Sequence, residues 1–515
     1  MKLIFCGVNA SYTHTSFSLY ALRAQLADSW DCDILECNIN QRPEDIVGAL
    51  SDARGDVYLF SCYLWNIETI LRAVSDLKKI RSCIVALGGS EVSYSPEDIL
   101  DKNSSVDYVI SGEGEETLCR FLNSLQGGEN PASLPNIYSK GKKYEGVLPS
   151  GFNFSCRRFP YDDALIEQTR GRILYYESAR GCPFRCSYCI SELDRELRVV
   201  PLEQVKEELL FFMKRRVAQV KFIDRTFNAD PKRAAQIIRF ILEHNQGTNF
   251  HFEVCLELMT PELSSLLQGA PVGYFQLEAG LQSTNPATLQ AIGRRNNFPL
   301  FAQAMSELTA AQNVHIHADL IAGLPLETID TFRAGFDALY RQQPHMLQLG
   351  FLKVLKGTRM EREAKRYGIV YSSHPPYEVL KTNDMSYEEL QGLKNIAYLV
   401  DKYHNSAGFR QSLKRAIAYE GSPFGFFQKL SSYFRANGLF SRPLSKGELY
   451  RILYDCFTQY SIPGKEAVVF DYLKSCALSL PPYFSQCAAP APKEEVFELL
   501  KNETWVKKYL PEYAN

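Results

Sequence analysis

Short apolar runs alternate with amphipathic stretches over the first 125 residues. Runs rich in β-branched, aromatic and leucine residues predict strands, and apolar residues at helical spacing predict helices. The predicted strands are 3–8, 33–37, 57–61, 84–87 and 108–111, and the predicted helices are 18–27, 43–53 and 67–80. Strands that alternate with helices form a parallel sheet covered on both faces. We therefore expect residues 1–125 to form a Rossmann-like, doubly wound α/β domain.

The alternation stops at residue 126 and resumes at residue 172. Residues 126–171 lose periodicity and collect Gly, Pro, Ser and Lys, which is typical of a linker. Strands are then predicted near 172–178, 219–224, 250–257, 273–279, 314–321 and 346–354. Asp230-Pro231, Thr260-Pro261 and Asn285-Pro286 each place a capping side chain before a proline at the first helical position. Residues 172–365 thus predict a partial (β/α)6 barrel, with its chemistry at the carboxyl ends of the strands.

The pattern changes again in the last part of the chain. Residues 366–515 predict helices at 387–402, 409–419, 446–457 and 494–501, with many Tyr and Phe between and within them. We expect a separate all-α domain whose aromatic side chains form its core. It carries no catalytic motif.

Composition narrows the class of protein. The chain has 515 residues, 45% of them hydrophobic, and a net charge of −2, so no overall field favours nucleic acid. No apolar run approaches the length of a membrane span. The N-terminal residues predict a buried strand, with no cleavage site of a signal peptide. Scattered cysteines in apolar runs indicate buried free thiols, so we expect a cytoplasmic protein.

Three cysteines, Cys182, Cys186 and Cys189, form a C-x₃-C-x₂-C array after the apolar stretch 173–176. Thiolates of one tight loop can bind a single iron–sulfur cluster. Because three ligands are one short of four, one iron stays open to a small molecule, as at catalytic metal sites. A zinc knuckle is the alternative, but it needs a nearby fourth Cys or His, and the next histidine is His244.

This array resembles the signature of the radical S-adenosylmethionine (SAM) superfamily, and the resemblance covers residues 172–365. The strand-end motifs are similar to those of the branch that includes anaerobic coproporphyrinogen oxidase and the methylthiotransferases. The resemblance implies a 4Fe–4S cluster on the three cysteines. It also implies a SAM pocket formed by Tyr188, Glu253, Gly280, Gln282, Ser283, Arg294 and Asp319. Carboxylates can accept from the hydroxyl and ammonium groups of SAM, and an arginine can pair with its carboxylate.

An α/β domain before such a barrel resembles the cobalamin-binding domain of the cobalamin-dependent branch. Three loops carry this resemblance, through Ser61, Tyr63, Trp65, Gly88, Gly89, Gly112 and Gly114. In many corrinoid proteins, the histidine of an Asp-x-His-x-x-Gly motif binds cobalt. His14 is the only histidine of residues 1–125, and the Asp and Gly of the motif are missing around it. We therefore do not expect His14 to bind cobalt. A Rossmann-like domain without a ligand remains the alternative.

Together these resemblances imply an anaerobic enzyme that uses a 4Fe–4S cluster, SAM and cobalamin. It would cleave SAM reductively to a 5′-deoxyadenosyl radical and methylate an unactivated carbon of an unknown organic substrate. An electron donor such as flavodoxin or ferredoxin is implied, and no catalytic residue is assigned beyond the cofactor ligands. A non-methylating rearrangement, cyclisation or oxidation is the nearest alternative. A methylthiotransferase lacks support because no second three-cysteine cluster precedes the barrel, and a non-catalytic corrinoid or iron–sulfur sensor needs no SAM pocket.

Overall fold

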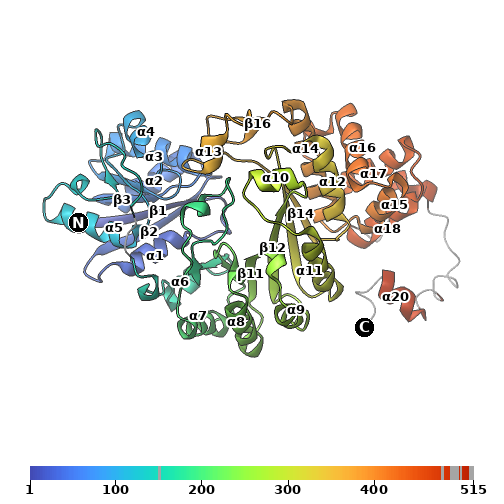
Figure 1. The fold of residues 1–515 in the computed structure, drawn as a ribbon, viewed down its shortest axis with the longest axis horizontal. Coiled ribbons are helices and arrows are strands. Elements are labelled where there is room, and N and C mark those ends of the chain that lie inside the picture. Colours follow the sequence, from blue (N-terminus) through green and yellow to red (C-terminus); the bar gives the residue numbers. More distant parts are fainter. Residues whose placement is uncertain (149–151, 477–480, 488–497, 499–500, 510–515) are drawn as a thin grey trace. The chain divides into compact units, whose positions relative to one another are not determined.

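The computed structural model describes residues 1–148, 152–476, 481–487, 498 and 501–509 (Figure 1). The chain divides into two compact units, Met1–Lys394 and Asn395–Asn515. The first unit contains both large sheets, each of six strands. All the residues that the sequence assigns to cofactors belong to this first unit.

The N-terminal sheet has the strand order β2-β1-β3-β4-β5-β6. Its strands are β1 (Lys2–Asn9), β2 (Asp31–Asn38), β3 (Val57–Ser61), β4 (Ile84–Gly88), β5 (Tyr108–Ile110) and β6 (Ile137–Tyr138). The first five run parallel. Their order is that of a doubly wound fold whose direction of winding reverses between β1 and β3. The expected Rossmann-like sheet is confirmed.

Helices cover both faces of this sheet. One core packs α2 (Pro43–Ala53), α3 (Ile67–Ile80) and α4 (Pro96–Lys102) on one face, and a second core packs α1 (Phe17–Gln25) and α5 (Gly114–Gln126) on the other (Figure 1). The sequence predicts α1, α2 and α3 but misses the other two. One is only seven residues long. The other begins inside the glycine-rich turn that the sequence indicates as a loop.

The segment 126–171 is more than the linker that the sequence predicts. Its strand β6 pairs antiparallel with β5 and extends the N-terminal sheet. The ammonium of Lys142 donates to the carbonyls of Ala132, Leu134 and Ile137, each at 2.8 Å, and so fixes the turns around this strand. A two-residue strand held by one lysine leaves no periodic signal. Further along the segment lies α6 (Asp163–Gln168).

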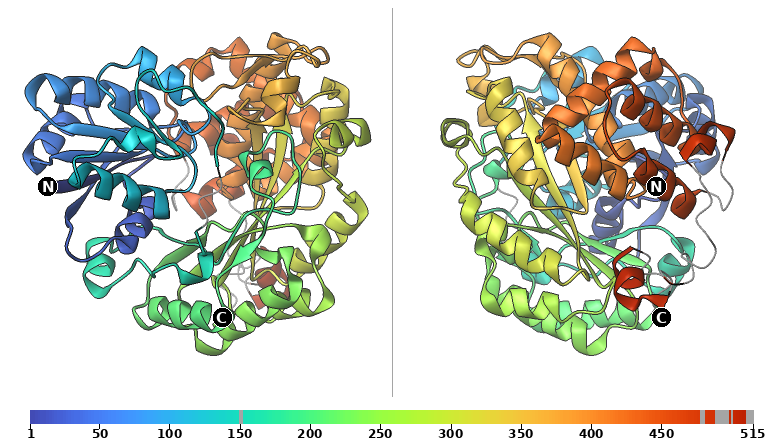
Figure 2. Two further views of the ribbon diagram at one scale, coloured as in Figure 1. Left: turned by 60° about the vertical axis from the view of Figure 1, so that its left-hand side comes forward. Right: turned by 90° about the vertical axis from the view of Figure 1, so that its right-hand side faces the viewer.

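The barrel sheet confirms the six predicted strands, in the order β7-β10-β11-β12-β13-β14 and all parallel. They are β7 (Leu174–Tyr176), β10 (Gln219–Phe222), β11 (Asn249–Val254), β12 (Phe275–Gln282), β13 (His315–Ala322) and β14 (Met346–Phe351). In Figure 2 these green and yellow strands lie side by side, with helices outside them. The helices are α7 (Leu202–Lys214), α8 (Pro231–His244), α9 (Pro261–Gln268), α10 (Pro286–Ala291), α11 (Phe298–Ala310), α12 (Ile329–Tyr340) and α13 (Arg359–Glu363).

The three predicted helix starts are confirmed at their caps. The side chain of Asp230 accepts from two backbone N–H groups of α8. The side chains of Thr260 and Asn285 each accept from one N–H group, of α9 and α10 respectively. Each cap follows a strand end by three to eight residues, and it fixes where the next helix begins.

The second unit is helical. It contains α15 (Arg410–Glu420), α16 (Pro423–Ala436), α17 (Lys446–Gln459), α18 (Lys465–Ser475) and α20 (Glu503–Tyr509). The predicted helix 387–402 is present as α14 (Tyr387–Leu399), which continues as a π-helical turn, Val400–Asn405. The sequence does not predict α16, α18 or α20, and the prediction at 494–501 lies almost wholly outside the described residues. Aromatic side chains form the core as expected; Tyr403, Phe434 and Tyr450 are fully buried.

The helical part begins later than residue 366. A hairpin of β15 (Val370–Tyr371) and β16 (Val379–Lys381) precedes it and belongs to the first unit. Within the described ranges, the structure contains no helix that is long and apolar enough to cross a membrane.

Asn66 joins the carboxyl ends of β1 and β3, where the winding of the N-terminal sheet reverses. Its amide donates to the carbonyls of Val8 and Ser61, each at 3.0 Å, and its oxygen accepts from the N–H of Tyr63 at 2.8 Å. The side chain is only 2% exposed. Water therefore cannot replace these three hydrogen bonds.

We predict that Asn66→Ala destabilises this edge of the sheet. Leaving buried backbone groups without partners costs about 1–3 kcal/mol for each group. The midpoint of thermal unfolding should fall, whereas Asn40→Ala, at an exposed asparagine, should leave it unchanged. Equal midpoints for the two variants would show that Asn66 does not join the strand ends.

Candidate functional site

A cavity of about 1250 Å³ lies between the N-terminal sheet and the mouth of the barrel. Its walls come from the carboxyl ends of β1, β3 and β4 on one side and of β7, β10 and β11 on the other. All seven loop residues predicted from the sequence line it: Ser61, Tyr63, Trp65, Gly88, Gly89, Gly112 and Gly114. Among the predicted SAM residues, Glu253 reaches the same wall.

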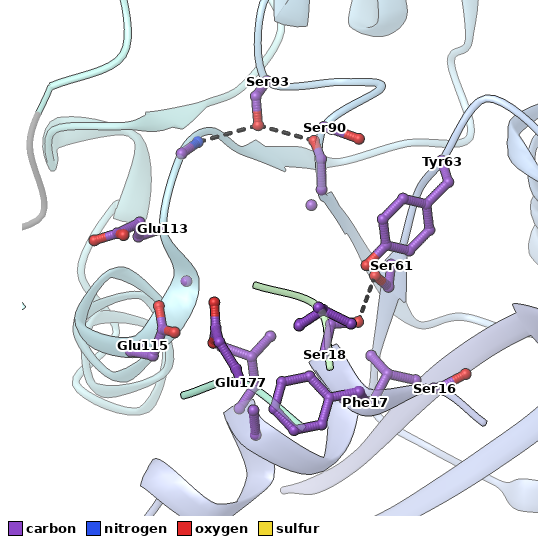
Figure 3. A pocket seen from close by; sticks show the side chains of 18 of the residues that line it. Ser16, Phe17, Ser18, Ser61, Tyr63, Ser90, Ser93, Glu113, Glu115 and Glu177 are labelled. Carbon is purple, nitrogen blue, oxygen red and sulfur yellow. Dashed lines mark hydrogen bonds between the residues drawn. The ribbon is translucent and has the colours of Figure 1, made fainter. Parts of the chain in front are cut away.

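Hydroxyl groups and backbone atoms form much of the N-terminal wall. The Ser93 hydroxyl donates to the Gly89 carbonyl at 2.8 Å and accepts from the Gly112 N–H at 3.1 Å, so it bridges two loops (Figure 3). Gly89 has a φ of 104°, and a Cβ there would lie 2.5 Å from the Cys62 carbonyl oxygen. A larger residue at this position would therefore push the wall out of place.

The same wall carries an aromatic surface. The rings of Tyr63 and Trp65 stack with centroids 4.4 Å apart, and Trp65 is 44% exposed. A large exposed aromatic beside hydroxyl groups and bare backbone suits a broad ligand with both apolar and polar edges. The cavity therefore fits cobalamin by size and by the chemistry of its lining.

The cysteine loop is closed at its base by a short antiparallel ribbon of β8 (Ala179–Arg180) and β9 (Arg198–Val199). Gly181 follows with a φ of 90°, and its missing Cβ leaves room for the carbonyl of Glu196. The backbone N–H of Cys182 donates to the backbone carbonyl of Asp194 at 3.0 Å. These contacts turn the loop back on itself.

The three cysteine thiols lie near one another and form no disulfide. Burial raises the pKa of the Cys182 thiol, and the charges of Cys189 and Cys186 raise it further. Within the described ranges, no three His, Cys, Asp or Glu side chains can share a single metal ion. A 4Fe–4S cluster makes a different demand, since each thiolate binds a different iron. Three neighbouring thiols of one loop fit that demand.

Three of the predicted SAM residues lie on successive strands of the barrel sheet. Glu253 is at the end of β11, Gln282 at the end of β12 and Asp319 in β13. The Oδ1 atom of Asp319 and the Oε1 atom of Gln282 are buried without a hydrogen-bond partner. Burial raises the pKa of the Asp319 carboxyl to about 8, and the charges of Glu278 and Glu253 add to the shift. Buried acceptors without donors fit a ligand that brings hydroxyl or ammonium groups.

Arg294 connects these strand ends to the cysteine loop. Its guanidinium donates to the Gly280 carbonyl and lies 3.9 Å from the Cys186 sulfur and 3.5 Å from the Tyr188 hydroxyl. Within the described residues it has no carboxylate within 4.0 Å. A cation without a counter-ion fits a ligand carboxylate. Ser283 differs, because its hydroxyl already accepts from the Asn285 N–H at 3.0 Å.

Several interlobe contacts hold the N-terminal sheet against the barrel, and three of them contain largely buried ion pairs. The first surrounds the start of β7: Arg172 pairs with Glu36 at 2.8 Å and also donates to the carbonyl of His14. The ring of His14 lies 2.6 Å, through Nδ1, from the hydroxyl of Tyr175. Burial lowers the pKa of His14, as do the charges of Lys221 and Arg172. His14 therefore has a partner within the protein, the hydroxyl of Tyr175.

The second contact joins Arg180 to three carboxylates. It pairs with Glu115 at 2.6 Å, Glu177 at 2.8 Å and Glu113 at 3.1 Å. Arg198 pairs with the same Glu113 at 2.6 Å. Figure 3 shows the three glutamates along one side of the cavity. These ion pairs therefore join α5 and the turn before it to the base of the cysteine loop.

The third contact lies at the far side of the barrel. Glu91, only 6% exposed, pairs with Lys356 at 3.1 Å and accepts from the Tyr377 hydroxyl. The sequence indicates neither this contact nor the second one. Arg180 stands next to the cysteine motif and Glu113 between two predicted glycines, but their pairing spans 67 residues and leaves no local pattern.

We predict a pH-dependent contribution from Asp319 in protein without added ligand. A carboxyl whose pKa is about 8 in the folded protein and about 4 when unfolded favours folding less as the pH rises between those values. Asp319→Asn mimics the protonated side chain. Its thermal midpoint should match that of the native protein near pH 4, exceed it increasingly up to about pH 8 and then exceed it by a constant amount.

The matched control for Asp319 is Asp330→Asn, at an aspartate with an 81% exposed side chain. It should shift the midpoint equally little at every pH. A difference between native protein and Asp319→Asn that stays constant from pH 5 to 8 would contradict a raised pKa.

Three family models match the chain. Residues 5–122 match the B12 binding domain, residues 176–339 the radical SAM superfamily, and residues 365–515 a protein of unknown function, DUF4080. One similar protein is the 2-(S-pantetheinyl)-carbapenam-3-carboxylate methyltransferase of Streptantibioticus cattleyicolor. It is 25% identical over 74% of this chain and 62% of its own. Another is the cobalamin-dependent radical SAM methyltransferase TokK of Streptomyces tokunonensis, 26% identical over 58% of this chain and 47% of its own.

Solved structures share the fold. The cobalamin-dependent SAM radical enzyme OxsB with aqua-cobalamin bound matches with a TM-score of 0.66 at 15% identity, over 100% of this chain and 84% of that one. The radical SAM methyltransferase TsrM from Kitasatospora setae matches with a TM-score of 0.60 at 17% identity, over 74% of this chain and 80% of that one. The chain spans less than two thirds of the two curated relatives.

The family models account for both walls of the cavity. The B12 binding match contains the glycine and hydroxyl loops, and the radical SAM match contains the cysteine loop and the residues predicted to bind SAM. The expected cofactors, a 4Fe–4S cluster, SAM and cobalamin, are therefore confirmed. The chain therefore carries a B12-binding domain followed by a radical SAM domain.

Proposed function

We propose that this protein is a cobalamin-dependent radical SAM enzyme that cleaves SAM reductively and methylates an unactivated carbon of an organic substrate. One observation carries the proposal: the loops of the B12-binding domain and the strand end at Glu253 line the same cavity. A shared cavity lets the two cofactors and a substrate meet without leaving the protein. The relatives that are named methyltransferases support methyl transfer over the other radical reactions.

The residues divide the work of holding the cofactors. Cys182, Cys186 and Cys189 bind the cluster, Arg294 pairs with the carboxylate of SAM, and Asp319 and Glu253 accept from its hydroxyl or ammonium groups. When bound, the reduced cluster supplies the electron that splits SAM into methionine and a 5′-deoxyadenosyl radical, while cobalamin supplies a methyl carrier. The interlobe contacts close the cavity around them and limit the access of water.

The remaining assignments follow from this function. We assign residues 1–125 to cobalamin binding, 172–365 to the radical SAM barrel and 366–515 to a C-terminal domain, with 126–171 connecting the first two. A small protein such as flavodoxin or ferredoxin supplies the electron, and the enzyme works in the cytoplasm, where such donors are found. Oxygen must be excluded from every assay, because it destroys exposed clusters.

We predict that Cys182→Ala, Cys186→Ala and Cys189→Ala each abolish the cluster and SAM cleavage. Protein reconstituted anaerobically with iron, sulfide and hydroxocobalamin is desalted, and its absorption spectrum is recorded. After reduction, 5′-deoxyadenosine is measured by chromatography. Cys156→Ala, at an exposed cysteine outside the loop, is the control and should keep both properties. Cluster absorption that survives in all three loop variants would refute the assignment.

The products separate methylation from the nearest alternative. An enzyme that transfers methyl groups forms S-adenosylhomocysteine from SAM when cobalamin is present, in addition to 5′-deoxyadenosine. An enzyme for rearrangement, cyclisation or oxidation forms 5′-deoxyadenosine alone. We expect S-adenosylhomocysteine in the native protein and its loss when reconstitution omits cobalamin.

A further inference from the structure

Three segments of the first unit meet on the outer side of the cysteine loop. The Arg359 guanidinium donates to the Arg185 carbonyl at 3.2 Å. The backbone N–H of Ser187 donates to the Ile292 carbonyl at 2.8 Å, and the backbone N–H of Met360 donates to the Ser187 carbonyl at 2.8 Å. The loop that carries Cys186 is therefore bound on one side to the turn after α10 and on the other to α13. These segments form one continuous surface next to the proposed cluster.

This surface carries five arginines, which we call the arginine face: Arg185, Arg295, Arg359, Arg362 and Arg366. All but Arg359 are exposed. Of these five arginines, only Arg359 lies within 4.0 Å of a carboxylate of a described residue. Its distance to the Glu192 carboxylate is 3.9 Å. The Arg362 guanidinium donates to a backbone carbonyl, and that of Arg366 lies over the ring of Tyr367.

The arginine face borders a groove of about 670 Å³, lined by Arg359, Arg366, Glu363 and Asp384 among others. Asp384 accepts from the Leu326 N–H at 3.0 Å, so its charge is partly used within the fold. Five arginines against these carboxylates leave the surface positive, although the whole chain has a net charge of −2. The concentration of cations is therefore local to the cysteine loop.

The arginine face differs from the other arginines near the site in its lack of close carboxylate partners among the described residues. Arg172, Arg180 and Arg198 each pair with carboxylates at 3.1 Å or less. Cations gathered without counter-ions repel one another, and a negatively charged partner relieves this repulsion and is steered towards the surface. Phe184, which directly precedes Arg185, is 37% exposed and offers an apolar contact to such a partner.

We propose that the arginine face docks the acidic one-electron donor protein that reduces the cluster. This inference rests on the proposed function, which requires one electron for each SAM cleaved. The donor loses one electron and the oxidised cluster gains it, and no bond is made or broken in this step. The half-buried Cys186 directly follows Arg185 in the chain, so a protein bound at the face approaches the cluster without entering the cavity.

The test compares two reductants. Holoprotein with all three cofactors receives electrons from reduced flavodoxin or from dithionite, and formation of 5′-deoxyadenosine is followed. We expect Arg362→Glu/Arg366→Glu to lower the flavodoxin-driven rate about tenfold or more and to leave the dithionite-driven rate unchanged. Arg185→Glu, on the loop itself, serves as an independent second variant. The control, Lys214→Glu, makes the same kind of charge change at the far end of α7 and should alter neither rate.

Salt provides a further readout, because it screens attraction between exposed charges. The flavodoxin-driven rate of the native protein should fall as salt rises, and that of the double variant should change little. Flavodoxin-driven rates that stay native in both arginine variants would overturn the proposal, as would equal losses with dithionite. Failure of the native protein to cleave SAM with dithionite would instead refute the proposed function.

Discussion

The ion pairs of Arg180 are the constraint on which the site depends. This one guanidinium meets Glu113 and Glu115 of the N-terminal lobe and Glu177 of the barrel, all within 3.1 Å. Removing one member of a largely buried pair typically costs about 3–5 kcal/mol, since the other charge is left without a partner. Because Arg180 directly precedes the turn into Cys182, the same contact fixes the spacing of the two lobes and the base of the cysteine loop.

The site is unfinished without its ligands, and each unfinished part matches one of them. The Oδ1 atom of Asp319 and the amide oxygen of Gln282 lack donors, while Arg294 has no carboxylate within 4.0 Å in the part of the chain that the structure describes. Groups of this kind are costly when buried alone and are retained where a ligand completes them. The stacked Tyr63 and Trp65 similarly present an apolar surface to the cavity. Binding of the cofactors therefore supplies partners to groups that are costly to bury alone.

Local signals account for what the sequence predicts. A capping Asp or Asn before a proline, as at Asp230 and Asn285, is a local signal that favours a helix start, and the cysteine spacing needs only one loop. The strand β6 escaped prediction because two residues give no period, and the interlobe contacts escaped it because they join distant parts of the chain. The pairing of Glu91 with Lys356, across 265 positions, exists only in the folded protein.

The central claim is that one cavity brings the corrin and the cluster close together. Ile190 and Leu193, just after Cys189, line the cavity that Trp65 also lines. Electron paramagnetic resonance of protein holding both cobalt(II) cobalamin and the reduced cluster tests this directly. The account predicts magnetic coupling that broadens the cobalt signal relative to protein with the oxidised, diamagnetic cluster. Cobalt spectra that are identical in the two samples would contradict it.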